Sequence, residues 1–81
     1  MPTVFRWKGY RFFFYSNEGE PLEPVHVHIR KGENLAKFWL EPIVSPAESY
    51  GISPQELNKL EKVVENNAKS IKRAWYEYFG D

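Results

Sequence analysis

The stretch VHVHIRKGENLAKFWL (residues 25–40) decides the fold, because apolar and polar residues alternate on both sides of a central turn signal. Successive side chains of a β-strand point to opposite faces, so this pattern predicts strands at 25–30 and 35–40 joined by residues 31–34. His28 then faces Lys37, and His26 faces Trp39. One face carries the apolar residues Val25, Val27, Ile29, Ala36, Phe38 and Leu40, and the other carries His26, His28, Arg30, Lys37, Trp39 and Glu41. A slip of one residue would spoil both faces, which supports this register.

A second hairpin precedes this one. Residues 3–7 and 10–15 are rich in aromatic residues and flank Lys8 and Gly9, a two-residue link suited to a tight turn. In that register Arg6 faces Arg11. The predicted core face carries Phe5, Trp7, Tyr10, Phe12 and Phe14, and the other face carries Val4, Arg6, Arg11, Phe13 and Tyr15.

The C-terminal part predicts one long helix. Ser53, Pro54 and Glu56 form a capping box with proline at the first helical position. Spacings of three and four residues then place one apolar stripe along the helix, formed by Leu57, Leu60, Val64, Ala68, Ile71, Trp75 and Phe79. Residues 41–53 read as irregular, with a short extended piece around Ile43 and Val44. The predicted fold is therefore α+β, with a four-stranded antiparallel sheet of two hairpins packed on one long C-terminal helix.

Length and composition limit the alternatives. The 81 residues have room for a single domain, 1–81, and 14 aromatic residues can give it a core. Cysteine is absent, which excludes disulfides and thiolate chemistry. No secretory leader and no apolar run of about 20 residues occur, so we expect a cytoplasmic protein that does not contact a membrane.

The formal net charge is zero, from 11 basic and 11 acidic residues. This balance argues against electrostatic capture of nucleic acid by the whole chain. The charges are nevertheless segregated: residues 1–15 and 25–40 are basic, residues 16–24 and 41–53 are acidic, and residues 54–81 are balanced. One face of the sheet can therefore be positive within a neutral chain.

His26 and His28 are the most reactive pair in the sequence. Two residues apart on one strand, they project to the same side, as in sites for a divalent metal, and an imidazole can also act as a general base. With no cysteine, further metal ligands would have to be carboxylates, and Glu23 and Glu41 are the nearest. Two exposed strand histidines without such a role are the alternative.

Arg6 and Arg11 face each other in the predicted first hairpin, and like charges so placed repel. An anionic ligand would relieve the repulsion, and so would the protein's own carboxylates. Together with the basic residues of the second hairpin and with Tyr15 and Trp39, the arginines form a face of the kind that binds single-stranded RNA.

The sequence resembles domain-of-unknown-function family 4160. Three blocks carry the resemblance: YRFFFYSNE (10–18), EPVHVH (23–28) and AKFWL (36–40). Members are small prokaryotic proteins without an assigned activity, and the resemblance implies a link to toxin–antitoxin-like gene pairs. It also implies that one surface is formed by Arg11, Asn17, Glu18, His26, His28, Lys37 and Trp39.

These observations predict a small regulatory module that binds a protein partner, or RNA, with the polar sheet face, as one half of a toxin–antitoxin-like pair. A homodimer is a further expectation. The first alternative is a ribonuclease-type toxin in which His26 or His28 is the base and Arg11 and Lys37 stabilise the phosphate. The second alternative is a metal-binding module that uses His26 and His28. The sequence does not identify a cofactor or decide whether the protein is an enzyme.

Overall fold

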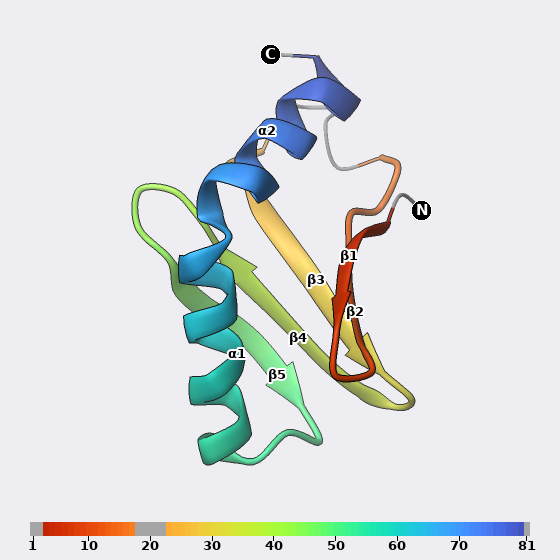
Figure 1. The fold of residues 1–81 in the computed structure, drawn as a ribbon, viewed down its shortest axis with the longest axis vertical. Coiled ribbons are helices and arrows are strands. Elements are labelled where there is room, and N and C mark those ends of the chain that lie inside the picture. The colour runs from red at the N-terminus through yellow and green to blue at the C-terminus, as the bar shows by residue number, and fades with distance from the viewer. Residues whose placement is uncertain (1–2, 18–22, 81) are drawn as a thin grey trace.

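Five antiparallel strands form one sheet, in which each strand pairs with the next along the chain, and two helices cover one side of it (Figure 1). The computed structural model describes residues 3–17 and 23–80. The α+β class and the antiparallel sheet are as predicted, but the numbers of strands and helices are not. The elements are β1 (Thr3–Trp7), β2 (Tyr10–Phe13), β3 (His26–Lys31), β4 (Asn34–Trp39), β5 (Ser45–Tyr50), α1 (Pro54–Asn66) and α2 (Ala68–Phe79).

Both predicted hairpins form in the predicted register, except that β1 shifts between Thr3 and Phe5 and Val4, predicted on the outer face, packs against the core. Arg6 pairs with Arg11 across β1 and β2, and the turn residues Lys8 and Gly9 have φ of 47° and 85°. Positive φ at both central positions is the geometry of a type I′ turn, whose twist matches that of the strands it joins. In the second hairpin His28 pairs with Lys37. Here the ladder continues to the pair Lys31 and Asn34, so the turn is shorter than predicted.

The prediction of four strands is wrong, because residues 45–50 form a fifth strand, β5, on the edge beside β4. The sequence SPAESY has little strand propensity, and Pro46 cannot donate to a ladder. An edge strand tolerates such residues, since only one of its sides needs a partner. The pairing with β4 therefore creates the strand. The register shifts between Lys37 and Phe38, which pair with Glu48 and Pro46, so Ala47 has no pairing partner on β4.

The prediction of one long helix is also wrong, because the helix breaks at Asn67. This residue has φ −115° and ψ 16°, and its side-chain Nδ2 donates to the carbonyl of Val63 at 2.8 Å. An asparagine side chain that bonds to the backbone competes with helical hydrogen bonds. The chain bends there, and α2 continues at an angle over the end of the sheet (Figure 1).

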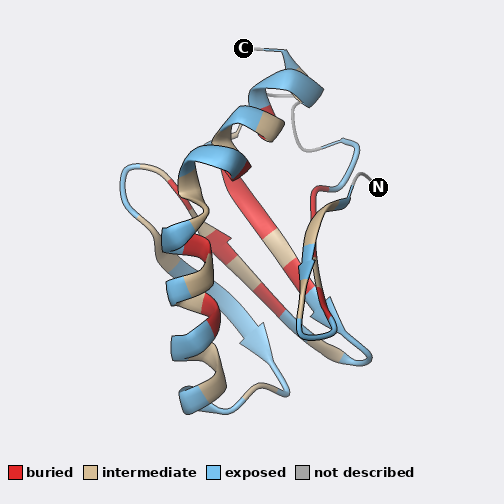
Figure 2. Ribbon diagram, in the orientation of Figure 1, coloured by how far each residue is buried: buried red, intermediate tan, exposed pale blue. Residues whose placement is uncertain are grey.

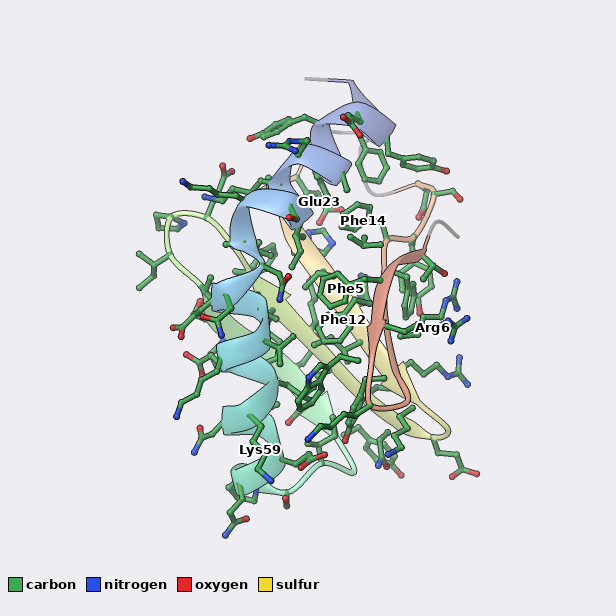
Figure 3. All side chains as sticks on the ribbon, in the orientation of Figure 1. Phe5, Arg6, Phe12, Phe14, Glu23 and Lys59 are labelled. Carbon is green, nitrogen blue, oxygen red and sulfur yellow. The ribbon has the colours of Figure 1, made fainter. Side chains whose placement is uncertain are left out.

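The core fills the space between the sheet and the helices (Figure 2). The apolar face predicted for the second hairpin is buried in full, and the predicted helix stripe packs against it across the break. Figure 3 shows Phe5, Phe12 and Phe14 between the helix layer and the strands, whereas Arg6 lies on the other side of β1. No helix among residues 3–17 and 23–80 is long and apolar enough to span a membrane.

Tyr10 links the sheet to the start of α1. Its side chain is 3% exposed, and its hydroxyl donates to Glu56 Oε2 at 3.2 Å. Glu56 belongs to the predicted capping box, where its backbone N–H donates to Ser53 Oγ at 3.1 Å. Burial raises the pKa of Tyr10, and the Glu56 carboxylate raises it further by charge and by the hydrogen bond. Tyr10 therefore stays protonated while the fold is intact at neutral pH.

Gly51 joins β5 to the helix layer and is expected to be the least replaceable turn glycine. Gly51 has φ 75° and Gly32 has φ 61°, so alanine is strained at both by about 1–2 kcal/mol. At Gly51 a Cβ would also lie 2.6 Å from Asn34 Oδ1, while at Gly32 it would meet open space. We expect Gly51→Ala to destabilise the protein more than the control Gly32→Ala, as measured by urea unfolding. Equal losses of stability in the two variants would contradict this placement of Asn34.

Candidate functional site

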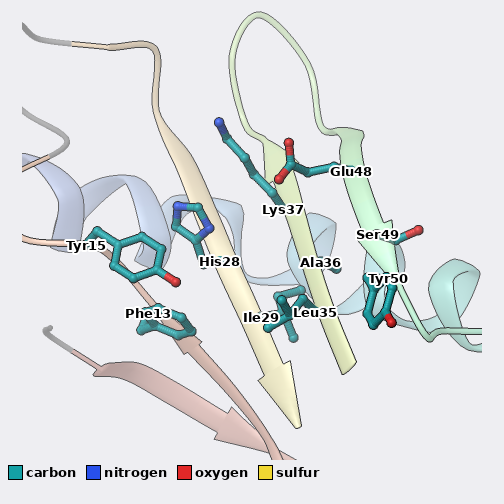
Figure 4. Close-up of a pocket in the computed structure, with 10 residues that line it drawn as sticks. All are labelled: Phe13, Tyr15, His28, Ile29, Leu35, Ala36, Lys37, Glu48, Ser49 and Tyr50. Atoms are coloured by element: carbon teal, nitrogen blue, oxygen red, sulfur yellow. The ribbon is translucent and has the colours of Figure 1, made fainter. Parts of the chain in front are cut away.

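The side of the sheet opposite the helices is called the open face. Apart from α2, which contacts His26 at one end of this face, no described helix packs on it, and in Figure 4 the helices pass behind the strands. Strand pairing places cations and aromatic rings on this face, with one carboxylate on β5. Its residues are Arg6, Arg11, Phe13, Tyr15, His28, Arg30, Leu35, Lys37, Trp39, Glu48 and Tyr50.

Three arginines line up across three neighbouring strands of the open face, and are called the arginine row. Arg6 on β1 pairs with Arg11 on β2, which pairs with Arg30 on β3. Arg11 Nε donates to Thr3 Oγ1 at 2.7 Å, and Arg30 Nε donates to the Gly32 carbonyl at 3.0 Å. Like charges on adjacent strands destabilise a sheet. An anion over this row would therefore be held by charge and by the guanidinium N–H groups.

An aromatic corner surrounds His28 beside the arginine row. Its ring stacks on Phe13 with centroids 5.7 Å apart and meets Tyr15 edge-on at 4.5 Å. Phe13 is 1% exposed although it lies on the outer face, because these neighbours cover it. His28 itself is half-buried. The corner thus holds the imidazole in place and leaves part of it accessible.

A shallow pocket of about 200 Å³ opens next to this corner (Figure 4). Phe13, Tyr15 and His28 form one side of it, and residues of β4 and β5 form the other. Leu35 is 41% exposed and Tyr50 is 70% exposed at the rim. The full lining is Phe13, Tyr15, His28, Ile29, Leu35, Ala36, Lys37, Glu48, Ser49 and Tyr50.

Cations cover two ring faces on this side of the sheet. Lys37 Nζ lies 4.3 Å from the centroid of the Trp39 ring, and Arg11 Cζ lies 4.5 Å from that of Phe13. Such cation–π contacts hold flexible cationic side chains in place. They also occupy ring faces on which a nucleic-acid base would otherwise stack.

His26 is buried, in contrast to the exposed pair that the sequence suggests. It is 0% exposed, and its ring lies 5.3 Å from that of Trp39 and 5.0 Å from that of Trp75 on α2. Its Nδ1 lies 2.9 Å from the carbonyl of Pro24. A carbonyl oxygen only accepts, so Nδ1 carries a proton. His26 packs the end of the sheet against α2, and α2 covers it because the helix bends at Asn67.

The burial of His26 concerns the two alternatives in which this residue takes part, as the base of a ribonuclease and as a metal ligand. The His26 and His28 rings are 5.2 Å apart, but the Nδ1 of His26 is engaged by Pro24. Among residues 3–17 and 23–80, no three His, Asp or Glu side chains gather as a metal site. Glu41 accepts instead from the hydroxyl of Tyr76 at 3.2 Å, and desolvation and this carboxylate raise the pKa of Tyr76.

The structure brings together part of the predicted surface. His28, Lys37 and Trp39 share the open face with Arg11, whereas Asn17 is exposed in the turn after β2. Glu18 lies outside the described residues. The sequence reading missed Leu35, Glu48 and Tyr50, which line the pocket. The last two sit on β5, so recognition of that strand would have added them.

The chain was compared with known protein families, curated proteins and solved structures. The family model described as domain of unknown function DUF4160 matches residues 9–76. That range includes β2 to β5 and most of the helix layer, and with them the pocket and two residues of the arginine row. No curated protein and no solved structure matches the chain.

Proposed function

The chain belongs to the DUF4160 family, and from its open face we propose that it is a protein-binding module whose partner supplies an acidic segment with an apolar anchor. The observation that carries this proposal is the pocket with exposed Leu35 and Tyr50 beside the arginine row. An apolar hollow with surrounding charged groups is the usual arrangement of a protein interface.

The charges of the open face favour an anionic partner. Arg6, Arg11, Arg30 and Lys37 are basic, and Glu48 is the acidic residue among the described side chains of this face. Charge complementarity raises the association rate and fixes the orientation of a partner.

A protein partner fits this face better than RNA does. Sequence-tolerant binding of single-stranded RNA depends on exposed ring faces on which bases stack. Here Phe13 is buried and cations lie over Phe13 and Trp39, which leaves Tyr15 and Tyr50 as the exposed rings of this face. The exposed groups next to the pocket include the aliphatic Leu35, which suits a protein side chain.

The two sheet edges support docking on the face rather than strand addition. β1 has an irregular register between Thr3 and Phe5, and β5 has one opposite Lys37 and Phe38. β5 also contains Pro46, which lacks an N–H donor. Bulges and prolines are features that discourage edge-to-edge pairing. A toxin–antitoxin-like pair, as the family resemblance implies, would supply such a partner protein for the face.

Site-specific photo-crosslinking in the native host tests this function. A benzophenone amino acid at Tyr50 sits on the open face, and one at Lys59 sits on the exposed side of α1 as the control. We expect Tyr50 to capture a discrete protein in a crosslink that protease removes and ribonuclease leaves intact, and Lys59 to capture none of it. Capture of RNA at Tyr50, or equal capture of the same protein at both positions, would contradict the proposal.

A further inference from the structure

We propose that the open face recognises one asymmetric pattern: an aromatic side chain seated in the pocket, with acidic residues on one side of it only. This inference rests on the proposed function and specifies the chemistry of the partner segment. It follows from three features of the face, which are the size of the pocket, the charges on its two sides and the spacing of the strands.

The pocket has room for one ring. Its volume is about 200 Å³. An apolar cavity of about 150 Å³ is known to hold benzene. The rings of Tyr15 and His28 offer edge and face contacts on one side, and Leu35 offers aliphatic contact on the other. Aromatic pairs with such geometry are favourable beyond the area that they bury.

The two sides of the pocket differ in charge. On the side of β1 to β3 lies the arginine row, with Arg30 in the same strand as the pocket residue His28. On the side of β5 lies Glu48, which pairs with Lys37. An acidic residue placed over β5 would meet Glu48, whereas one placed over β3 or β2 would meet an arginine. The partner's acids must therefore lie on a single side of the ring.

The strand spacing limits how far those acids lie from the ring. Neighbouring strands are about 4.8 Å apart, so Arg11 and Arg6 lie one and two strands beyond Arg30, at about 5 and 10 Å. An extended partner segment that crosses the strands advances about 3.3 Å per residue. Acidic residues within about three positions of the ring would reach the arginine row.

A peptide selection tests this pattern. Random dodecapeptides displayed on phage are selected on the immobilised full chain, after depletion on the Leu35→Ala/Tyr50→Ala variant. Both replaced side chains are exposed, so the variant keeps its core. We expect enriched peptides to carry one aromatic residue with two or more acids within three positions, all on the same side. Enrichment of peptides without the ring, of peptides with acids on both sides, or of no peptide would overturn the inference.

For a matched control, the affinity of one enriched synthetic peptide is measured for two variants of the chain. We expect Leu35→Ala/Tyr50→Ala to weaken its binding at least tenfold in a fluorescence titration. Ile43→Ala removes another apolar side chain, which is 70% exposed but lies outside the pocket, and it should change the affinity less than twofold. If Ile43→Ala weakens binding equally, the pocket is not the anchor site. Protein capture at Tyr50 without the peptide pattern would refute this inference and leave the proposed function standing.

Discussion

Replacing Trp75 with alanine is expected to lower the free energy of unfolding by about 3–5 kcal/mol. Trp75 is 0% exposed, and its ring contacts Phe14, Phe79 and His26 at centroid distances of 5.2, 4.4 and 5.0 Å. These contacts hold α2 over the end of the sheet, which α1 does not cover. The free energy of unfolding of such domains is about 5–15 kcal/mol, so this loss would remove much of the stability. Thermal unfolding followed by circular dichroism measures it, with an expected fall in Tm of about 12 °C or more.

Two further variants keep this expectation testable if the alanine variant fails to fold. Trp75→Phe retains a ring, and it removes an indole N–H that has no hydrogen-bond acceptor among the described residues. It should therefore cost much less than Trp75→Ala. Tyr76→Ala truncates the neighbouring aromatic residue, which is 40% exposed, and it should cost about 1 kcal/mol or less. Equal effects of Trp75→Ala and Tyr76→Ala would contradict the packing of α2.

The two hairpins and the capping box were predictable because each depends on local pattern. Alternation over residues 25–40 sets both the strands and their register, and Lys8 with Gly9 sets the first turn. β5 was not predictable in this way, because its sequence has little strand propensity and pairing with β4 imposes its conformation. The helix break had one sequence signal, the pair Asn66 and Asn67 within the apolar stripe. The continuous spacing across that pair concealed the break.

The candidate site was predictable in outline only. Side-chain alternation placed His28, Lys37 and Trp39 on one face correctly. It could not show that α2 bends over His26, since that contact joins residues far apart in the chain. It also could not show the pocket, because Glu48 and Tyr50 enter the face through a strand that pairing creates. Tertiary contacts decide both features.

Reversing two charges on the open face is expected to weaken partner binding at least tenfold. Arg30→Glu/Lys37→Glu replaces two cations beside the pocket with carboxylates, which would repel an acidic segment and add to the charge of Glu48. The control Lys62→Glu/Lys69→Glu also changes the net charge from zero to −4, as Arg30→Glu/Lys37→Glu does. Its two substitutions lie at exposed positions on α1 and α2. The comparison therefore separates the local charge of the face from the charge of the whole chain.

The most direct measurement is the yield of the protein crosslink from the benzophenone at Tyr50 in these two backgrounds. Circular dichroism confirms first that both variants are folded. If the open face is the partner surface, the yield falls at least tenfold in Arg30→Glu/Lys37→Glu, which corresponds to about 1.4 kcal/mol or more when binding is far from saturation. The same account predicts a yield within about twofold of the unmodified chain in Lys62→Glu/Lys69→Glu. Equal yields in the two variants would contradict it.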